Sequence, residues 1–176
     1  HPDLQLEVLS QVTNPRLVIL DTMNLWINTT LPSLKKVIQK VDAIIVNDQE
    51  AFMLTGEHNL IKAARGVSKM GPKTVVVKKG EHGAFIISDN HFFSVPAFPL
   101  EELYDPTGAG DSFAGGMVGY IAKVGDGSFD SIRKAIVYGS VTASFAVERF
   151  SIERLKSMNL TEIEERYQKF VEITRF

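Results

Sequence analysis

Cysteine is absent from this sequence of 176 residues, which excludes disulfide bonds and thiolate metal sites. The absence is typical of a reducing compartment, so we expect a cytoplasmic location. Long apolar runs are also missing, and none approaches the ~20 residues that a transmembrane helix requires. Nothing at the start of the sequence has the pattern of a signal peptide. Neither sign of charge dominates, since Lys and Arg number 19, Asp and Glu number 21, and the formal net charge is −2. We therefore expect no binding to nucleic acid or to an anionic membrane.

Three short apolar runs, rich in β-branched residues, each end at a polar residue. Residues 17–20 end at Asp21, residues 43–46 end at Asn47, and residues 74–77 end at Lys78. Such runs are typical of strands buried on both faces of a parallel sheet. Apolar residues at helical spacing lie between the runs, so the sequence predicts an α/β layered domain. Residues 84–87 and 91–95 predict an antiparallel hairpin.

The second half of the sequence is predicted to be helical. Helices are expected over residues 112–123 and 132–148, the latter rich in small residues. A capping box of Thr161 and Glu164 predicts the start of a last amphipathic helix. The length corresponds to one domain. The polar opening at His1 shows no start of an element, and we expect the chain to be a piece of a longer polypeptide.

The stretch D-P-T-G-A-G-D-S-F-A-G-G, residues 105–116, places glycines and an acid where a helix begins. The first N–H groups of a helix are unpaired and partly positive, and glycine lets an anion approach them. Gly108, Ala109 and Gly110 have this form. Asp111 then has two interpretations. It is a helix N-cap, or it is a general base that takes a proton from a hydroxyl attacking a phosphoryl group.

Two further segments follow strands at the edge of the sheet where ligands gather. Asn47 and Glu50 offer oxygen ligands that suit Mg²⁺ through retained water, although a polar helix N-terminus accounts for them equally well. Lys78, Gly80 and Gly83 form a turn that could admit phosphates, and an ordinary turn is the alternative.

Together these segments resemble the ribokinase-like, or PfkB, family of carbohydrate and nucleoside kinases. Residues 105–111 match the family's second signature, and Asn47-x-x-Glu50 and Lys78-x-Gly80-x-x-Gly83 agree in order and separation. The resemblance covers the chain from about Leu17 onward. It implies a ribokinase-like three-layer α/β/α fold with a mostly parallel sheet. Residues 1–176 would form the C-terminal, ATP-binding and catalytic-base part of a single kinase domain, truncated at its N-terminal side and without the lid.

The resemblance also implies roles for single residues. Asp111 would be the catalytic base, with Gly108, Ala109 and Gly110 as the anion hole. Asn47 and Glu50 would organise Mg²⁺ and its waters around the ATP phosphates. The remaining implied positions contact the nucleotide or a monovalent cation: Lys78, Gly80 and Gly83 line the nucleotide, Ser140 lies near the adenine pocket, and Asp105 and Thr107 help hold the cation. Residues 146–151 lack the glycine that completes the cation site in many relatives, which argues against K⁺ activation.

The leading hypothesis is therefore phosphoryl transfer from ATP to a hydroxyl of a small-molecule sugar or nucleoside. Without a lid to exclude water, the 176-residue chain is expected to bind ATP or ADP weakly and to transfer little by itself. A non-catalytic nucleotide-binding or regulatory fragment is the alternative. A dinucleotide-binding oxidoreductase is less favoured, since no G-x-G-x-x-G follows the first strand. The identity of the acceptor and the formation of a homodimer stay open.

Overall fold

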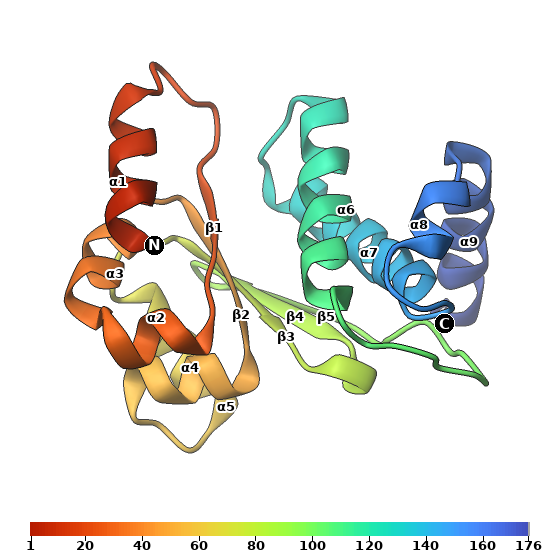
Figure 1. Ribbon diagram of the computed structural model, residues 1–176, viewed down its shortest axis with the longest axis horizontal. Helices are drawn as coiled ribbons and strands as arrows, with labels where there is room; N and C mark the ends of the chain where they lie inside the picture. Colours follow the sequence, from red (N-terminus) through yellow and green to blue (C-terminus); the bar gives the residue numbers. More distant parts are fainter. Residues whose placement is uncertain (176) are drawn as a thin grey trace. The chain divides into compact units, whose positions relative to one another are not determined.

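The computed structural model describes residues 1–175, which divide into two compact units (Figure 1). Unit 1 comprises His1–Lys79 and Phe85–Phe93, and unit 2 comprises Gly80–Ala84 and the chain from Ser94 onward.

A five-stranded sheet with the order β1-β2-β3-β4-β5 forms the framework of unit 1, and only Ala84 of β4 and Ser94 and Val95 of β5 are assigned to unit 2. Its strands are β1 (Ile19–Asp21), β2 (Ala43–Asn47), β3 (Thr74–Lys78), β4 (Ala84–Ser88) and β5 (His91–Val95). The first three are parallel, and their register pairs Asn47 with Lys78. Thr74 at the start of β3 and Ser88 at the end of β4 share a hydrogen bond of 2.9 Å between their hydroxyls, so these strands are antiparallel. The expected mostly parallel sheet is thus mixed, because a two-residue turn can join β4 and β5 only as a hairpin.

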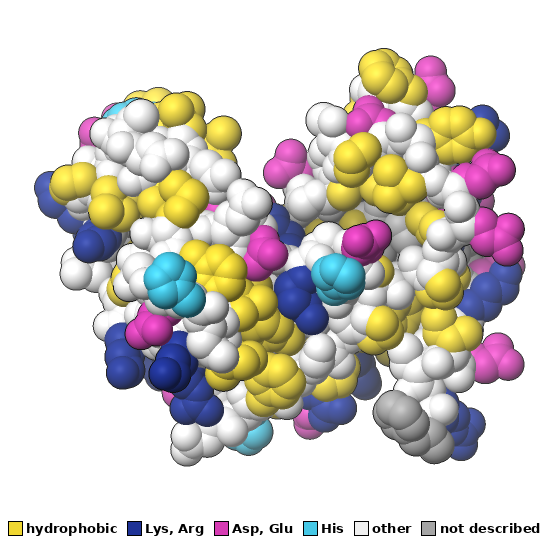
Figure 2. All heavy atoms as spheres, turned by 90° about the horizontal axis from the view of Figure 1, so that it is seen from below, with side chains coloured by type: hydrophobic (Ala, Val, Ile, Leu, Met, Phe, Trp, Pro, Cys, Tyr) yellow, Lys and Arg dark blue, Asp and Glu magenta, His cyan; other side chains and the backbone are white. Residues whose placement is uncertain are grey.

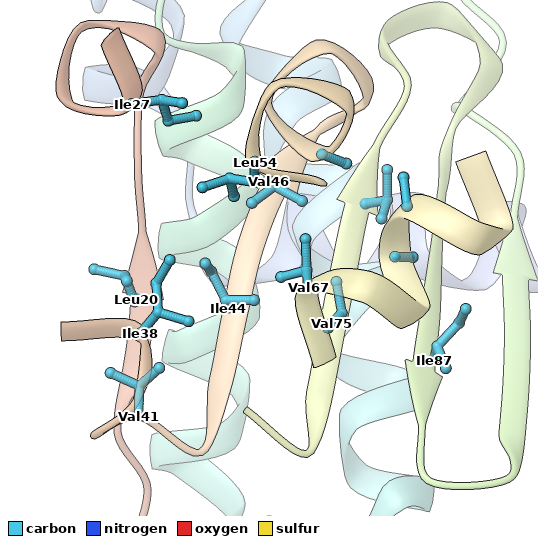
Figure 3. Packing of buried hydrophobic residues seen from close by; sticks show 14 of the residues in the cluster. Leu20, Ile27, Ile38, Val41, Ile44, Val46, Leu54, Val67, Val75 and Ile87 are labelled. Atoms are coloured by element: carbon cyan, nitrogen blue, oxygen red, sulfur yellow. The ribbon is translucent and has the colours of Figure 1, made fainter. Parts of the chain in front are cut away.

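The core of unit 1 lies between this sheet and its helices. These helices are α1 (Pro2–Gln11), α2 (Asn24–Thr29), α3 (Leu31–Ile38), α4 (Asp48–Thr55) and α5 (Leu60–Ser68). Figure 3 shows Ile38, Ile44, Val67 and Val75 gathered into one apolar cluster. Ile44 and its neighbour Ile45 are both fully buried. Since successive residues of a strand point to opposite faces, β2 is buried on both faces, as its unbroken apolar run predicts.

The first residues form helix α1, so the expectation that no element begins there was wrong. The N–H of Asp3 donates to Nδ1 of His1, and Pro2 occupies the first helical turn. Proline is favoured at this position because it has no N–H to leave unpaired. An acid in the first turn adds to this signal, which the sequence therefore carried.

Unit 2 is built from α6 (Ala109–Val124), α7 (Phe129–Ala146), α8 (Glu153–Ser157) and α9 (Leu160–Ile173), with a short 3₁₀ turn, η1 (Gly80–His82). Glycines allow α6 and α7 to pack closely. A Cβ placed on Gly116 would lie 2.4 Å from Oγ1 of Thr142, and one on Gly139 would lie 2.8 Å from the carbonyl oxygen of Phe113. The small residues of the predicted helix over 132–148 therefore serve helix contact.

The capping box of α9 consists of Asn159 and Glu162, so the expected box of Thr161 and Glu164 was wrong. The N–H of Glu162 donates to Oδ1 of Asn159 at 3.1 Å, and the N–H of Asn159 donates to Oε2 of Glu162 at 3.2 Å. Glu164 instead accepts a hydrogen bond of 2.8 Å from the hydroxyl of Tyr138. Two overlapping N/T-x-x-E patterns compete here, and the earlier one also includes Leu160 in the helix.

Acidic and basic side chains are interspersed on the face drawn in Figure 2, in keeping with the small net charge. Within residues 1–175, no helix is both long enough and apolar enough to cross a lipid bilayer.

Candidate functional site

In unit 1, the polar residues that end β1, β2 and β3 lie at one edge of the sheet. Nζ of Lys78 lies 3.3 Å from both carboxylate oxygens of Asp21. Because β2 lies between β1 and β3, the Lys78 side chain reaches across the end of β2 to make this ion pair. Both side chains are partly shielded from water, which strengthens their attraction.

Asn47 and Glu50 form a complete capping box at the start of α4. The N–H of Glu50 donates to Oδ1 of Asn47, and the N–H of Asn47 donates to Oε2 of Glu50, each at 2.8 Å. The structural interpretation of this pair as a polar helix N-terminus is therefore correct. The capping box leaves one carboxylate oxygen of Glu50 unused, because Oε1 has no hydrogen-bond partner within residues 1–175.

The electrostatic state of Glu50 suits a cation. The residue is only 5% exposed, and burial raises its pKa above the ordinary value, against the opposing effects of the Asn47 N–H and the Lys78 ammonium. A divalent cation nearby would favour the ionised form. Within residues 1–175, no group of three or more His, Cys, Asp or Glu could hold a metal by itself. Mg²⁺ fits this donor set if water and phosphate oxygens complete its coordination.

Gly80 and Gly83 both adopt positive φ, at 56° and 81°. A Cβ on Gly83 would lie 2.1 Å from the carbonyl oxygen of Val95, so only glycine fits there. A Cβ on Gly80 would meet nothing within 4 Å, so its backbone is open to a ligand. The two glycines thus have different local reasons to be glycine.

In unit 2, the loop before α6 is held by Asp105. Its Oδ1 accepts from the N–H of Thr107 at 2.9 Å, and its Oδ2 accepts from the N–H of Ser151 at 3.3 Å. These hydrogen bonds lower the pKa of Asp105 below its ordinary range, and those from Thr107 have the largest effect. The Asp105 carboxylate therefore organises the loop as an anion.

The start of α6 has no side-chain cap. Its N-cap is Gly108, at φ 79°, and the N–H of Ala109 donates to the carbonyl oxygen of Pro106 at 3.1 Å. The next two N–H groups, of Gly110 and Asp111, have no acceptor within residues 1–175. Of the expected anion hole, Ala109 is thus the member whose N–H is already engaged. Within residues 1–175 the open donors here are the N–H groups of Gly108, Gly110 and Asp111, of which the last two belong to the first helical turn.

Asp111 is the third residue of α6, so the interpretation of this residue as the N-cap was wrong. Its side chain is exposed and has no hydrogen bond or ion pair within residues 1–175. A carboxylate with no structural partner stands beside two open N–H donors. This arrangement can hold an anionic group and accept a proton next to it.

The remaining candidates, Ser140 and Thr107, lie on α7 and in the loop before α6. Ser140 is 7% exposed. Thr107 is exposed, with its N–H engaged by Asp105. Ser151, in the segment expected to limit K⁺ binding, instead supplies an N–H to Asp105.

Sequence reasoning missed the contacts that depend on distant residues. Asp21 and Lys78 are 57 positions apart, and no local pattern links them. The same holds for Arg154, which bridges Glu148 and Glu162 and had no signal in the sequence.

The sequence matches known proteins along most of its length. The description "pfkB family carbohydrate kinase" applies to residues 7–155. A cytidine kinase from Thermococcus kodakarensis is 41% identical over 90 residues, which are 49% of this chain and 32% of that protein.

Solved structures show the same fold. A ribokinase from Thermotoga maritima superposes with a TM-score of 0.74 at 24% identity, over 93% of this chain and 52% of that one. An E. coli protein, provisionally named ribokinase II and solved with ATP and Mg²⁺, gives a TM-score of 0.65 at 30% identity, over 82% of this chain and 45% of that one. The described residues therefore have a ribokinase-like α/β fold. The chain spans about half the length of these solved proteins and about a third of the cytidine kinase.

Proposed function

The chain belongs to the pfkB family of carbohydrate kinases, and from this premise we propose that it supplies the nucleotide-binding and catalytic-base part of an ATP-dependent kinase. The reaction transfers the terminal phosphoryl group of ATP to a hydroxyl of a sugar or a nucleoside. Residues 1–176 act as the C-terminal portion of one ribokinase-like domain.

The observation that carries this proposal is the start of α6. The open N–H groups of Gly110 and Asp111 suit the oxygens of a transferring phosphoryl group. The exposed Asp111 carboxylate has no other partner, so it is free to accept the proton of an attacking hydroxyl. Both features occur within one turn of one helix. Gly108, at positive φ, and Ala109 shape the backbone that leads into it.

The nucleotide and its metal involve the other predicted residues. Asn47 and Glu50 would hold Mg²⁺ through water, where the ion would neutralise charge on the ATP phosphates. The unused oxygen of Glu50 supports this role, as does the relative solved with ATP and Mg²⁺. The proposed nucleotide contacts are Lys78, Gly80, Gly83 and Ser140. Asp105 and Thr107 would hold a monovalent cation if one is used.

A second candidate is nucleotide binding without catalysis. The observation that favours it is the length of the chain, about half that of the solved relatives. In this case residues 1–176 bind ATP or ADP, and no phosphoryl transfer occurs even in the complete polypeptide. Both functions share the nucleotide site and differ in whether product forms.

Replacing Asp111 tests the proposal. In the complete polypeptide that carries this sequence, Asp111→Asn should lower kcat by about 10²- to 10⁴-fold, because a general base contributes that much. Binding of Mg·ATP should change little. The matched control is Asp130→Asn, an exposed acid in the first turn of α7, which should leave kcat unchanged. A near-normal kcat for Asp111→Asn would remove Asp111 from the mechanism.

The 176-residue chain separates the two candidates. Calorimetry with Mg·ATP measures binding, and chromatography after incubation with ribose or cytidine measures product. Binding without product from this chain, together with product from the complete polypeptide, supports the kinase. Binding without product from both supports the second candidate.

A further inference from the structure

The segment that follows α7 is hydrogen-bonded to the loop that precedes α6. The N–H of Tyr104 donates to the carbonyl oxygen of Val147 at 2.9 Å, and the N–H of Asp105 reaches the same oxygen at 3.5 Å. In return, the N–H of Ser151 donates to Oδ2 of Asp105 at 3.3 Å. We call residues 147–151 the corner. Through these bonds, the corner fixes the chain three and four residues before the N-cap of α6.

Arg154 holds the corner from the other side. Its Nε lies 3.1 Å from Oε2 of Glu148, within the corner, and its guanidinium also pairs with Glu162 at the start of α9. Arg166 of α9 pairs with the other oxygen of Glu148. The side chains of this network are between 17% and 34% exposed, so water screens them less than ordinary surface pairs. The corner is thus tied to α9.

An aromatic ring fixes the two arginines. The guanidinium carbon of Arg154 lies 4.7 Å from the centre of the Phe145 ring, and that of Arg166 lies 3.5 Å from it. Phe145 is 1% exposed, so its ring has little freedom to move. Cation–π contact with a buried ring restricts the rotamers of both arginines.

The backbone of the corner is strained. Ser151 has φ 55°, a left-handed conformation that is unfavourable for a non-glycine residue. Such a conformation persists only where surrounding contacts determine it. Here it directs the Ser151 N–H toward the Asp105 carboxylate.

We propose that Arg154 is a positioning residue, which fixes the corner and thereby the direction of the open N–H groups of Gly110 and Asp111. The inference rests on the proposed function, since it concerns how that site is held. Arg154 acts through Glu148, the corner and Asp105, and contacts no nucleotide. Loss of Arg154 loosens the loop and weakens the hold on the terminal phosphoryl group, which ATP has and ADP lacks.

The test uses three variants of the 176-residue chain. Arg154→Ala removes the bridge, and Arg154→Lys keeps the charge but loses the planar fork that contacts two carboxylates. Lys156→Ala is the matched control, because it removes one positive charge from the exposed face of the same helix. Hydrogen exchange of the Tyr104, Thr107 and Ser151 amides reports on the loop. Calorimetry gives the affinities for Mg·ATP and Mg·ADP.

In Arg154→Ala, the three amides should exchange about 10-fold faster, and the affinity for ATP should fall about 10-fold while that for ADP changes less than about 2-fold. Arg154→Lys should restore part of both effects, and Lys156→Ala should show neither. If Arg154→Ala does not fold, Arg154→Lys alone should shift both readouts in the same direction by a smaller amount.

Two results would overturn the inference: unchanged amide exchange in both Arg154 variants, or equal losses of ATP and ADP affinity, which would make the network purely structural. Failure of the proposed function has a different signature. In that case the unaltered chain binds neither nucleotide, and the positioning role falls with it.

Discussion

The pattern Asn-x-x-Glu begins one helix in each unit, and the two copies differ in their surroundings. Asn47 and Glu50 cap α4, and Asn159 and Glu162 cap α9, with the same reciprocal hydrogen bonds. Glu50 is buried, its pKa is raised, and one of its oxygens is unused within residues 1–175. Glu162 is more exposed and pairs with Arg154, which lowers its pKa.

The comparison shows that the motif itself specifies only a capped helix. The same four-residue pattern produces the same local geometry in both places. Whether its glutamate can also serve a ligand depends on what packs around it. Glu162 pairs with the guanidinium of Arg154. Glu50 instead follows the carboxyl end of β2, where the ligands of parallel sheets gather.

The largest expected difference between the two copies concerns magnesium. Glu50→Gln should weaken Mg²⁺-dependent ATP binding by about 10- to 100-fold, the usual effect of losing a group that orders a metal's waters. Glu162→Gln should leave the magnesium dependence unchanged, because its partner is Arg154. Calorimetric titration of ATP at several Mg²⁺ concentrations measures both. Equal behaviour of the two variants would reduce Glu50 to a helix cap.

The sequence predicted those elements whose signals are local. The strands β2 and β3 were placed to within one residue, because unbroken β-branched runs of this length between polar residues are typical of buried strands. The start of α9 was misplaced because two overlapping patterns compete, and the hydrogen bond of Glu164 with the distant Tyr138 cannot be read locally.

The candidate site was predictable to the same degree. The glycine-acid stretch and Asn47-x-x-Glu50 are contiguous patterns, so the sequence drew attention to them. The hydrogen bonding and the burial of these residues were not predictable. The engaged N–H of Ala109, the exposed side chain of Asp111 and the burial of Glu50 each depend on tertiary packing.

Loss of the capping asparagine should have a smaller effect, on stability, and its size should depend on how buried the cap is. Asn159→Ala should lower the free energy of unfolding by about 0.5–1 kcal/mol, the typical loss for an exposed cap. Asn47→Ala should cost about 2 kcal/mol, because it also leaves the N–H of Glu50 unpaired in a partly buried place. Urea denaturation at neutral pH measures both values. A larger loss at Asn159 than at Asn47 would contradict the view that burial sets the difference.

The smallest expected effect is on the pH dependence of stability, and its sign differs between the copies. Burial raises the pKa of Glu50 above the ordinary 4.5, so the unfolded chain ionises first as pH rises. The contribution of Glu50 to stability is therefore fully present below the ordinary pKa and lost as pH rises through the folded value. Arg154 lowers the pKa of Glu162, so its contribution is present above the ordinary value and lost as pH falls through the folded one.

Each glutamine variant isolates the contribution of the glutamate it replaces to the pH dependence of stability. The unfolding free energy of the variant is subtracted from that of the unaltered chain at intervals from about pH 3 to pH 7. The difference should fall with rising pH for Glu50→Gln and increase for Glu162→Gln, by only a small amount in the second case because Glu162 is the more exposed glutamate and water partly screens its pair with Arg154. Curves of the same sign for both variants would mean that the capping bonds, which the copies share, outweigh the surroundings in which they differ.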